Sequence, residues 1–335
     1  MKTIIHIGLG KCLSTSLQHC WKRSNNYNCI HIENYSKKLN SILKNRNFNK
    51  AYLLRQSKEI FRAENIQFSK QNTNIITFEG LTFSFLGEPK LIDLIPIKWE
   101  IVVKTMRDAA SDGLLVVRDP VDWVKSAYAQ YIKQGGVLTF FDFITFNDDI
   151  ICANLDLASI KEIFEKNGVR IKILPLEAYK FNKNLFWDQY EKILELERPK
   201  PSDLPTGAAQ GNVTSYESLE IHRRINLILG YLENIYVSNN SFYKSQAGAM
   251  SETINLVRRW GSRRAIEHAT EKELTDLKKI LNCTNNAELQ ITELPKALLK
   301  SINENFLSTL QGCHFPFPEI LSGYTESLSQ ANASR

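Results

Sequence analysis

The sequence lacks the long apolar runs that a membrane-spanning helix needs, about 20 residues each. Met1 to Thr3 lead directly into a strand-like segment, without the pattern of a signal sequence. Six cysteines, at positions 12, 20, 29, 152, 283 and 313, show no spacing typical of metal ligands. We therefore expect a cytoplasmic protein with free thiols, no membrane span and no metal site.

The excess of positive charge is also small. Lysine and arginine outnumber aspartate and glutamate by 42 to 36, a net charge of +6, which suits anionic ligands but does not predict nucleic-acid binding. Arginines gather around Trp260, from Arg258 to Arg264, and Arg223 and Arg224 form a second pair. These residues are either a solvated helical face or a wall for an anionic acceptor or for a nucleotide.

The chain is long enough to bury a full core, with 335 residues of which 43% are hydrophobic. Strand-like and helical segments alternate, which predicts an α/β fold with a parallel sheet flanked by helices. The expected strands are 3–8, 28–33, 74–79, 113–118 and 169–175, and the expected helical segments are 14–23, 36–68 and 120–134. Residues 1–215 would form the core, and 216–326 a helical extension that packs on it and contributes to the acceptor site. A frayed tail would follow at 327–335.

The segment Thr3–Gln18 combines a strand, a glycine turn and a helix. Apolar residues from Ile4 to Ile7 predict a buried strand, and the i, i+3, i+4 spacing that begins at Leu17 predicts an amphipathic helix. Between them, the Lys11 ammonium, the hydroxyls of Ser14 and Thr15, and the N–H groups of the first helical turn converge on one point. This arrangement predicts a phosphate-binding site.

The spacing of this loop excludes the commonest nucleotide-binding loop. A Walker A motif needs glycine, four residues, then Gly-Lys-Ser/Thr. Ile5 stands where the first glycine belongs, and Cys12 stands where the magnesium-binding hydroxyl belongs. An ordinary ATPase loop is therefore not expected.

A second strand-to-helix segment begins at Gly113. The apolar run 114–117 predicts a buried strand, Asp119 is suited to cap the next helix, and Pro120 to be its first residue. Arg118, at the end of the strand, and Ser126, two turns into the helix, could hold another anion. Residues 99–108 are an alternative strand that also ends in Arg-Asp, but only the copy at Arg118 precedes a proline and an amphipathic helix.

Together the two segments resemble the sulfotransferases that use 3'-phosphoadenosine 5'-phosphosulfate (PAPS). That family carries Gly-x-x-Lys-(Thr/Ser)-Gly-Thr-Thr in its 5'-phosphosulfate loop and Arg-Asp-Pro, followed by a helical Ser, at its 3'-phosphate site. The resemblance covers residues 1–20 and 112–131 and departs at Cys12 and Leu13, where the family has a hydroxyl residue and glycine. It implies a P-loop-like nucleotide-binding fold with a largely helical C-terminal part.

The resemblance also assigns roles to residues. Lys11, Ser14 and Thr15 would bind the phosphosulfate, and Arg118 and Ser126 would bind the 3'-phosphate. The implied donor-binding residues are Lys11, Cys12, Ser14, Thr15, Ser16, Arg118 and Ser126. Weaker similarities lie at Ile171–Glu177, a later core strand with a trailing acid, and at Gln210–Thr214, a loop that closes over the nucleotide.

Transfer of a sulfuryl group needs in-line placement, a cation near the leaving phosphate and a base for the incoming hydroxyl. Sulfuryl carries less charge than phosphoryl, so a metal is less necessary. Lys11 would stabilise the leaving group, and Glu79, at the end of an apolar strand, would be the base. Glu33 and His31 are the reserve candidates. His6 alternates with isoleucines and is expected to be a hydrogen-bonded core histidine.

The expected acceptor is a hydroxyl on a carbohydrate or glycolipid, because the glutamate base and the Arg-Asp-Pro form resemble the carbohydrate-directed branch of the family. Two alternatives stay open: a divergent small-molecule kinase that uses ATP and Mg²⁺, and a non-catalytic nucleotide- or glycan-binding protein. Leu13, which stands where the family has glycine, is the feature that favours the second alternative. The sequence carries no indication of oligomeric state.

Overall fold

The computed structural model describes residues 2–9, 12, 14–45, 49–81, 88–200, 216–239, 257, 266, 268–281, 283, 294–313 and 315–333. Contacts between residues divide the chain into two compact units. The first comprises 1–123, 147–210 and 293–335, and the second comprises 124–146 and 211–292.

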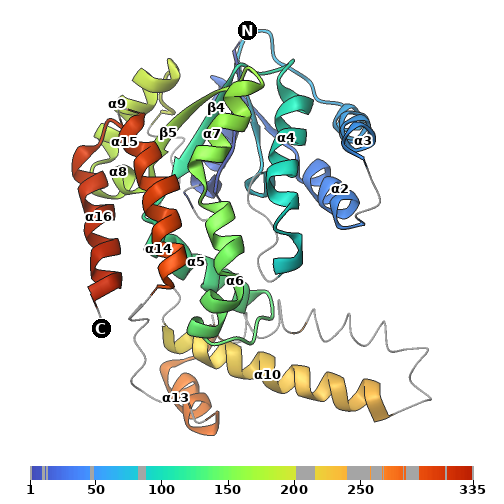
Figure 1. Ribbon diagram of the computed structural model, residues 1–335, viewed down its shortest axis with the longest axis vertical. Helices are drawn as coiled ribbons and strands as arrows, with labels where there is room; N and C mark the ends of the chain where they lie inside the picture. The colour runs from blue at the N-terminus through green and yellow to red at the C-terminus, as the bar shows by residue number, and fades with distance from the viewer. Residues whose placement is uncertain are drawn as a thin grey trace. The chain divides into compact units, whose positions relative to one another are not determined.

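The first unit contains a five-stranded sheet in the order β2-β3-β1-β4-β5, with every neighbouring pair parallel (Figure 1). The strands are β1 Thr3–His6, β2 Tyr27–His31, β3 Thr73–Thr77, β4 Asp112–Val117 and β5 Arg170–Pro175. The predicted α/β class, with a parallel sheet flanked by helices, is confirmed. The strands begin and end close to the predicted residues.

Helices cover both faces of this sheet. One layer contains α2 Glu33–Lys44, α3 Lys50–Ala63, α4 Leu94–Met106 and α7 Leu157–Lys166, of which α4 and α7 lie side by side (Figure 1). Right-handed crossovers place α1 Ser14–Arg23 on the opposite face, because β1 connects toward β2 whereas β4 connects toward β5. There the Trp21 indole donates to the Tyr190 hydroxyl of α9, Lys183–Leu194, at 3.0 Å.

The alternative strand at 99–108 is wrong, because this segment lies in helix α4 and the turn after it. Trp99, Val102 and Val103 are all buried, since α4 packs between α3 and α7. A helix buried on several sides has a continuous apolar run, which cannot be distinguished from a buried strand by periodicity.

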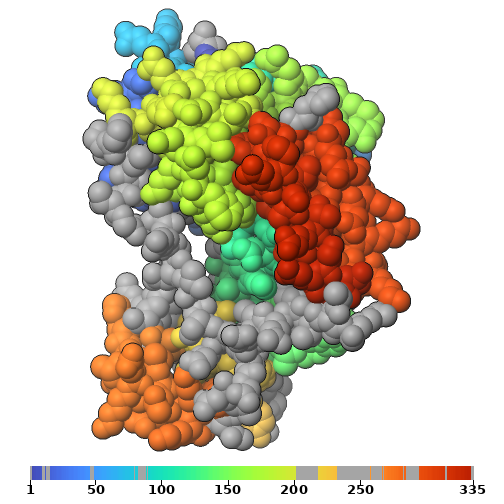
Figure 2. Space-filling model, turned by 90° about the vertical axis from the view of Figure 1, so that its left-hand side faces the viewer, coloured from blue at the N-terminus to red at the C-terminus, as the bar shows by residue number. Residues whose placement is uncertain are grey.

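The C-terminal helices also belong to the first unit. They are α14 Lys296–Ser301, the π-helix η6 Ile302–Leu307, α15 Ser308–Gly312 and α16 Pro318–Ala333. Figure 2 shows them in red and orange beside the yellow-green α8, Leu176–Phe181, and α9. The tail that we expected to fray is helical as far as Ala333, because Leu328 and Ala331 are buried.

The described part of the second unit consists mainly of helices. It contains α10 Tyr216–Asn239, α13 Glu271–Ile280 and parts of α5 Pro120–Lys133 and α6 Phe140–Asn154. Asn226 donates to the carbonyls of Ile132 and Gly136, both at 2.9 Å. Arg223 is buried and pairs with Glu220 at 2.6 Å, so it is not part of a solvated face.

Several other expectations concern features of the whole chain. All six cysteines are free thiols, as predicted. Among the described residues, no helix combines the length and the apolar character that a membrane crossing requires. The arginines from 258 to 264, the loop 210–214 and the proposed phosphate ligand Lys11 lie outside the described residues.

Candidate functional site

The loops after β1 and β4 lie at the same end of the sheet, which we call its carboxyl end. These strands are neighbours, with His6 in register with Leu114, and their crossovers run in opposite directions. Open parallel sheets bind ligands at such a switch point, outside the carboxyl ends of the strands. The fold therefore brings together the two segments that the sequence marks as anion sites.

Hydrogen bonds connect the backbone after β1 to β4 and to the first turn of α5. The Ile7 N–H donates to the Leu114 carbonyl at 2.8 Å, and the Trp123 indole donates to the Leu9 carbonyl at 3.0 Å. Trp123 is buried in the first turn of α5, where the alternative to this bond would be an unsatisfied donor. The backbone after β1 is thus held against the start of α5.

The described residues of the β1–α1 loop, 7–9 and 12, are buried. Leu9 and Cys12 are 2% and 0% exposed, and α1 begins at Ser14 as predicted. The buried Cys12 thiol therefore does not face solvent, and Ser16 lies half-buried in the first turn of α1. Lys11 and the side chains of Ser14 and Thr15 lie outside the described part of the structure.

The Arg118–Pro120 turn has the predicted cap. Asp119 Oδ1 accepts the Asp122 N–H at 3.0 Å, and α5 begins at Pro120. Arg118 follows β4 directly; its side chain is 19% exposed and its Nη2 lies 3.4 Å from the Asp122 carboxylate. Ser126 is half-buried farther along α5, in the second unit.

Behind this turn lies a hydrogen-bonded acidic pair that the sequence reasoning missed. Glu177 Oε1 accepts the Asp119 N–H at 3.3 Å, and Glu177 Oε2 accepts the Tyr324 hydroxyl. Ser327 Oγ donates to Asp119 Oδ1 at 3.3 Å. Burial is the main cause that raises the pKa of Asp119. In the sequence, Glu177 stands out only as an acidic residue that follows a predicted strand. No local pattern connects it to Tyr324, which lies 147 positions later.

The turn that carries Glu79 is anchored from two sides. Glu79 begins the short 3-10 helix η1, Glu79–Leu81, and its side chain lies outside the described atoms. The Gly80 carbonyl accepts hydrogen bonds from Ser36 Oγ at 2.9 Å and from Lys98 Nζ at 2.5 Å. Lys98 is 0% exposed, and this burial lowers its pKa to about 7.

The reserve bases differ in their surroundings. Glu33 pairs with Lys37 at 2.6 Å, and this hydrogen bond is the main cause that lowers the pKa of its carboxyl. A carboxylate stabilised in its charged form accepts a proton less readily, which weakens Glu33 as a base. Burial, with help from Lys22, lowers the pKa of His31, whose ring lies edge-on to Phe78 at 5.4 Å.

His6 is a hydrogen-bonded core residue, as predicted. It is 0% exposed, its Nδ1 lies 2.8 Å from Thr77 Oγ1, and Gln18 donates to the same hydroxyl at 3.0 Å. Burial lowers the pKa of His6 to about 3, so its ring is neutral at physiological pH. The His6 ring packs against the Trp21 ring of α1, edge to face, with the ring centroids 5.0 Å apart.

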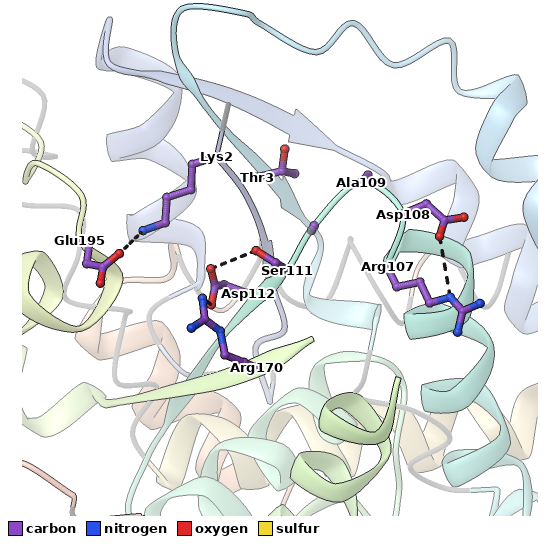
Figure 3. Close-up of a pocket in the computed structure, with 10 residues that line it drawn as sticks. Lys2, Thr3, Arg107, Asp108, Ala109, Ser111, Asp112, Arg170 and Glu195 are labelled. Atoms are coloured by element: carbon purple, nitrogen blue, oxygen red, sulfur yellow. Dashed lines mark hydrogen bonds and ion pairs between the residues drawn. The ribbon is translucent and has the colours of Figure 1, made fainter. Parts of the chain in front are cut away.

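A pocket of about 490 Å³ lies at the opposite, amino end of the sheet (Figure 3). Three cations line it, and each lies near a carboxylate: Lys2 and Glu195 at 3.2 Å, Arg170 and Asp112 at 3.0 Å, Arg107 and Asp108 at 3.8 Å. The lining charges cancel, so this pocket is a poor anion site. The alternative Arg-Asp pair at 107–108 therefore lies far from the switch point.

No group of three or more His, Cys, Asp or Glu side chains within the described residues is placed to hold a metal ion. Comparisons of the chain with models of protein families, with curated proteins and with solved structures found no match.

Proposed function

We propose that this protein is a PAPS-dependent sulfotransferase that moves a sulfuryl group to an acceptor hydroxyl. One observation carries the proposal: the two segments with phosphate-binding sequence patterns follow adjacent parallel strands, β1 and β4, and are joined by the Trp123–Leu9 hydrogen bond. A donor with phosphates at both its 5' and 3' positions needs two such sites close together. Neither pattern alone would distinguish this donor from other phosphorylated ligands.

The 5'-phosphosulfate would bind at the N-terminus of α1. Ser14 begins this helix, so the unpaired N–H groups of its first turn, together with the helix dipole, favour an anion there. Lys11 would add a full positive charge from the loop. The 3'-phosphate would bind Arg118, which leaves β4 beside the N-terminus of α5. The resemblance adds the hydroxyl of Ser126 to this second site.

In the proposed reaction, the acceptor oxygen forms a bond to sulfur while the bond between sulfur and the 5'-phosphate oxygen breaks. Glu79 takes the hydroxyl proton, and Lys11 stabilises the charge that develops on the departing adenosine 3',5'-bisphosphate. The products are the sulfated acceptor, the bisphosphate and one proton. When bound, PAPS supplies the activated sulfuryl group, and the protein supplies placement, charge and base.

The position of Glu79 supports its role as the base. β3 lies beside β1, with Thr77 in register with His6, and Glu79 follows Thr77 by two residues. The carboxyl ends of both strands meet at one end of the sheet, so Glu79 and the β1–α1 loop begin from neighbouring positions. The hydrogen bonds from Ser36 and Lys98 to Gly80 hold the backbone beside Glu79.

The acceptor that we propose is a hydroxyl on a carbohydrate or glycolipid. This part rests on the resemblance alone, because a glutamate base with an Arg-Asp-Pro turn is typical of the carbohydrate-directed branch. Incubation with labelled PAPS and a panel of glycans, phenols and tyrosine peptides would identify the class of acceptor. Label transfer to a phenol but not to any glycan would contradict the carbohydrate assignment.

A calorimetric titration with two nucleotides tests the donor assignment. Adenosine 3',5'-bisphosphate in EDTA should bind, whereas ATP with Mg²⁺ should bind more weakly, because Cys12 replaces the hydroxyl that holds Mg²⁺ in a Walker A loop. Preference for ATP with Mg²⁺ would favour a kinase. Binding of the bisphosphate without transfer to any acceptor would favour a non-catalytic binding protein.

A further inference from the structure

The C-terminal helix α16 reaches the back of the candidate donor site. Tyr324 is 2% exposed, and its hydroxyl donates to Glu177. Burial is the main cause that raises the pKa of Tyr324, and the neighbouring Glu177 carboxylate raises it further. The Tyr324 hydroxyl is therefore linked, through Glu177, to the Asp119 N–H in the turn after β4. Figure 2 shows the red helix beside the yellow-green α8 that carries Glu177.

Asp119 is fixed by bonds to its backbone and to its side chain. Its N–H donates to Glu177 at 3.3 Å, and its carbonyl accepts the Trp123 N–H at 2.8 Å. Its carboxylate accepts from the Asp122 N–H at 3.0 Å and from Ser327 at 3.3 Å. Because Arg118 precedes Asp119 directly, these bonds also fix the point from which the Arg118 side chain leaves the backbone.

The arrangement places two carboxylates, Asp119 and Glu177, behind a proposed anion site. Both are buried, and a buried carboxylate is costly unless hydrogen-bond donors surround it. Tyr324 and Ser327 are the donors that α16 supplies. Removing either hydroxyl would leave an acceptor unsatisfied and free the carboxylate to move toward Arg118, where it would compete with phosphate for the guanidinium.

We propose that Tyr324 and Ser327 are positioning residues for Arg118. They hold Glu177 and Asp119 in place, so that neither of these buried carboxylates competes with the 3'-phosphate for the guanidinium. The carboxylate that does lie 3.4 Å from Arg118 is the more exposed one of Asp122. This inference rests on the proposed donor site, and it adds the C-terminal helix to that site. Tyr324 lies 147 positions after Glu177, and Ser327 lies 208 positions after Asp119. Two residues distant in sequence would thus set the preference for a 3'-phosphorylated nucleotide.

The test compares adenosine 3',5'-bisphosphate with adenosine 5'-monophosphate, titrated separately into each variant. The dissociation constant of the monophosphate divided by that of the bisphosphate isolates the contribution of the 3'-phosphate. Tyr324→Phe keeps the ring, and Ser327→Ala removes only a hydroxyl; each should lower this ratio about 10-fold, the effect of one lost hydrogen bond to a charged group. Thr325→Val and Ser329→Ala are the matched controls, because their exposed hydroxyls bond only to carbonyls of α16, Leu321 and Thr325.

Hydrogen exchange of the free protein gives a second readout that needs no nucleotide. The amides from 119 to 123 should exchange faster in Tyr324→Phe than in the wild type or in Thr325→Val, because Glu177 then holds the Asp119 N–H less firmly. Equal exchange in all three proteins would overturn the positioning role, whatever the ligand proves to be.

The binding results separate the possible failures. If the wild type prefers the bisphosphate and both variants keep that preference, the positioning role is wrong and the donor site stands. If the variants weaken both nucleotides equally, α16 only stabilises the fold, and the inference is also wrong. If the wild type shows no preference for the bisphosphate, the donor assignment fails and the inference fails with it.

Discussion

At the amino end of the sheet each pocket-lining cation lies beside a carboxylate, whereas at the carboxyl end two helices begin. The amino end holds the pocket of about 490 Å³ with its paired charges. The carboxyl end holds the first turns of α1 and α5, whose N–H groups and dipoles favour anions. The direction of the strands and the positions of the helix N-termini therefore indicate an anion site at the end of the sheet where this pocket does not lie.

Buried carboxylates are also used differently at the two ends. Asp112, at the amino end, pairs with the exposed guanidinium of Arg170. Asp119 and Glu177, at the carboxyl end, accept hydrogen bonds from backbone N–H groups and from the hydroxyls of α16. Neither of these two carboxylates is paired with Arg118, which lies 3.4 Å from the more exposed carboxylate of Asp122. The predictions that follow test this difference.

The largest expected effect is that of Glu79→Gln. Loss of the proposed base should lower the rate of sulfuryl transfer by about two to four orders of magnitude, the usual contribution of a general base. Binding of adenosine 3',5'-bisphosphate, measured by calorimetry, should not change. Glu195→Gln, at the amino end, is the matched control and should keep the wild-type rate. Activity that survives in Glu79→Gln and is lost in Glu33→Gln would instead assign the base to the end of β2.

Lys11→Ala should lower turnover by about two to three orders of magnitude, because one charge donor to the leaving phosphate is lost. Lys2→Ala is the control at the amino end, where the Lys2 side chain pairs with Glu195 and donates to the Leu194 carbonyl. Thermal unfolding should show that Lys11→Ala folds like the wild type. Equal turnover in the two variants would remove the distinction between the two ends of the sheet.

The sequence predicted the elements around the site well, because the signals there are local. The strand, loop and helix of β1–α1, and the proline-capped start of α5, depend on apolar runs and on the capping residue Asp119. The core role of His6 followed from its alternation with isoleucines. Each of these features can be predicted from residues that are neighbours in the sequence.

What the sequence could not predict depends on distant contacts. The run at 99–103 was ambiguous because α4 is buried by α3 and α7, which are not adjacent to it in sequence. Tyr324 and Ser327 carry no pattern of their own, and only the fold places them behind Arg118. The buried Lys98 likewise depends on a distant contact, because its ammonium donates to the Gly80 carbonyl, eighteen residues earlier.

His6→Gln should change the pH dependence of stability. The pKa of His6 is about 3 in the folded protein and about 6.5 when unfolded, so the unfolded chain binds a proton first as the pH falls. Stability is thus fully present above pH 6.5 and falls by up to about 1.4 kcal/mol per pH unit between 6.5 and 3.

Urea unfolding at several pH values would measure this slope. His6→Gln should flatten the dependence on pH, whereas His19→Gln, which changes an exposed histidine of α1, should not. A wild-type slope retained in His6→Gln would mean that His6 is not buried in its neutral form at the carboxyl end of the sheet.

The smallest effect is expected for Trp123→Phe, which removes the hydrogen bond to Leu9 and leaves that carbonyl unsatisfied. Its free energy of unfolding should fall by about 1 kcal/mol more than that of Trp187→Phe. Trp187 is a matched control, because its buried indole N–H has no hydrogen-bond partner within the described part of the chain. Equal losses in the two variants, measured by urea unfolding, would show that this bond does not hold the loops together.

The most direct test of the account is a calorimetric titration of adenosine 3',5'-bisphosphate into the wild type, Arg118→Ala and Arg107→Ala. Each arginine precedes an aspartate, but they lie at opposite ends of the sheet. We predict that Arg118→Ala weakens binding about 10- to 100-fold, because hydrogen bonds to a charged phosphate are lost, and that Arg107→Ala does not. Binding that is lost in Arg107→Ala and retained in Arg118→Ala would contradict the account.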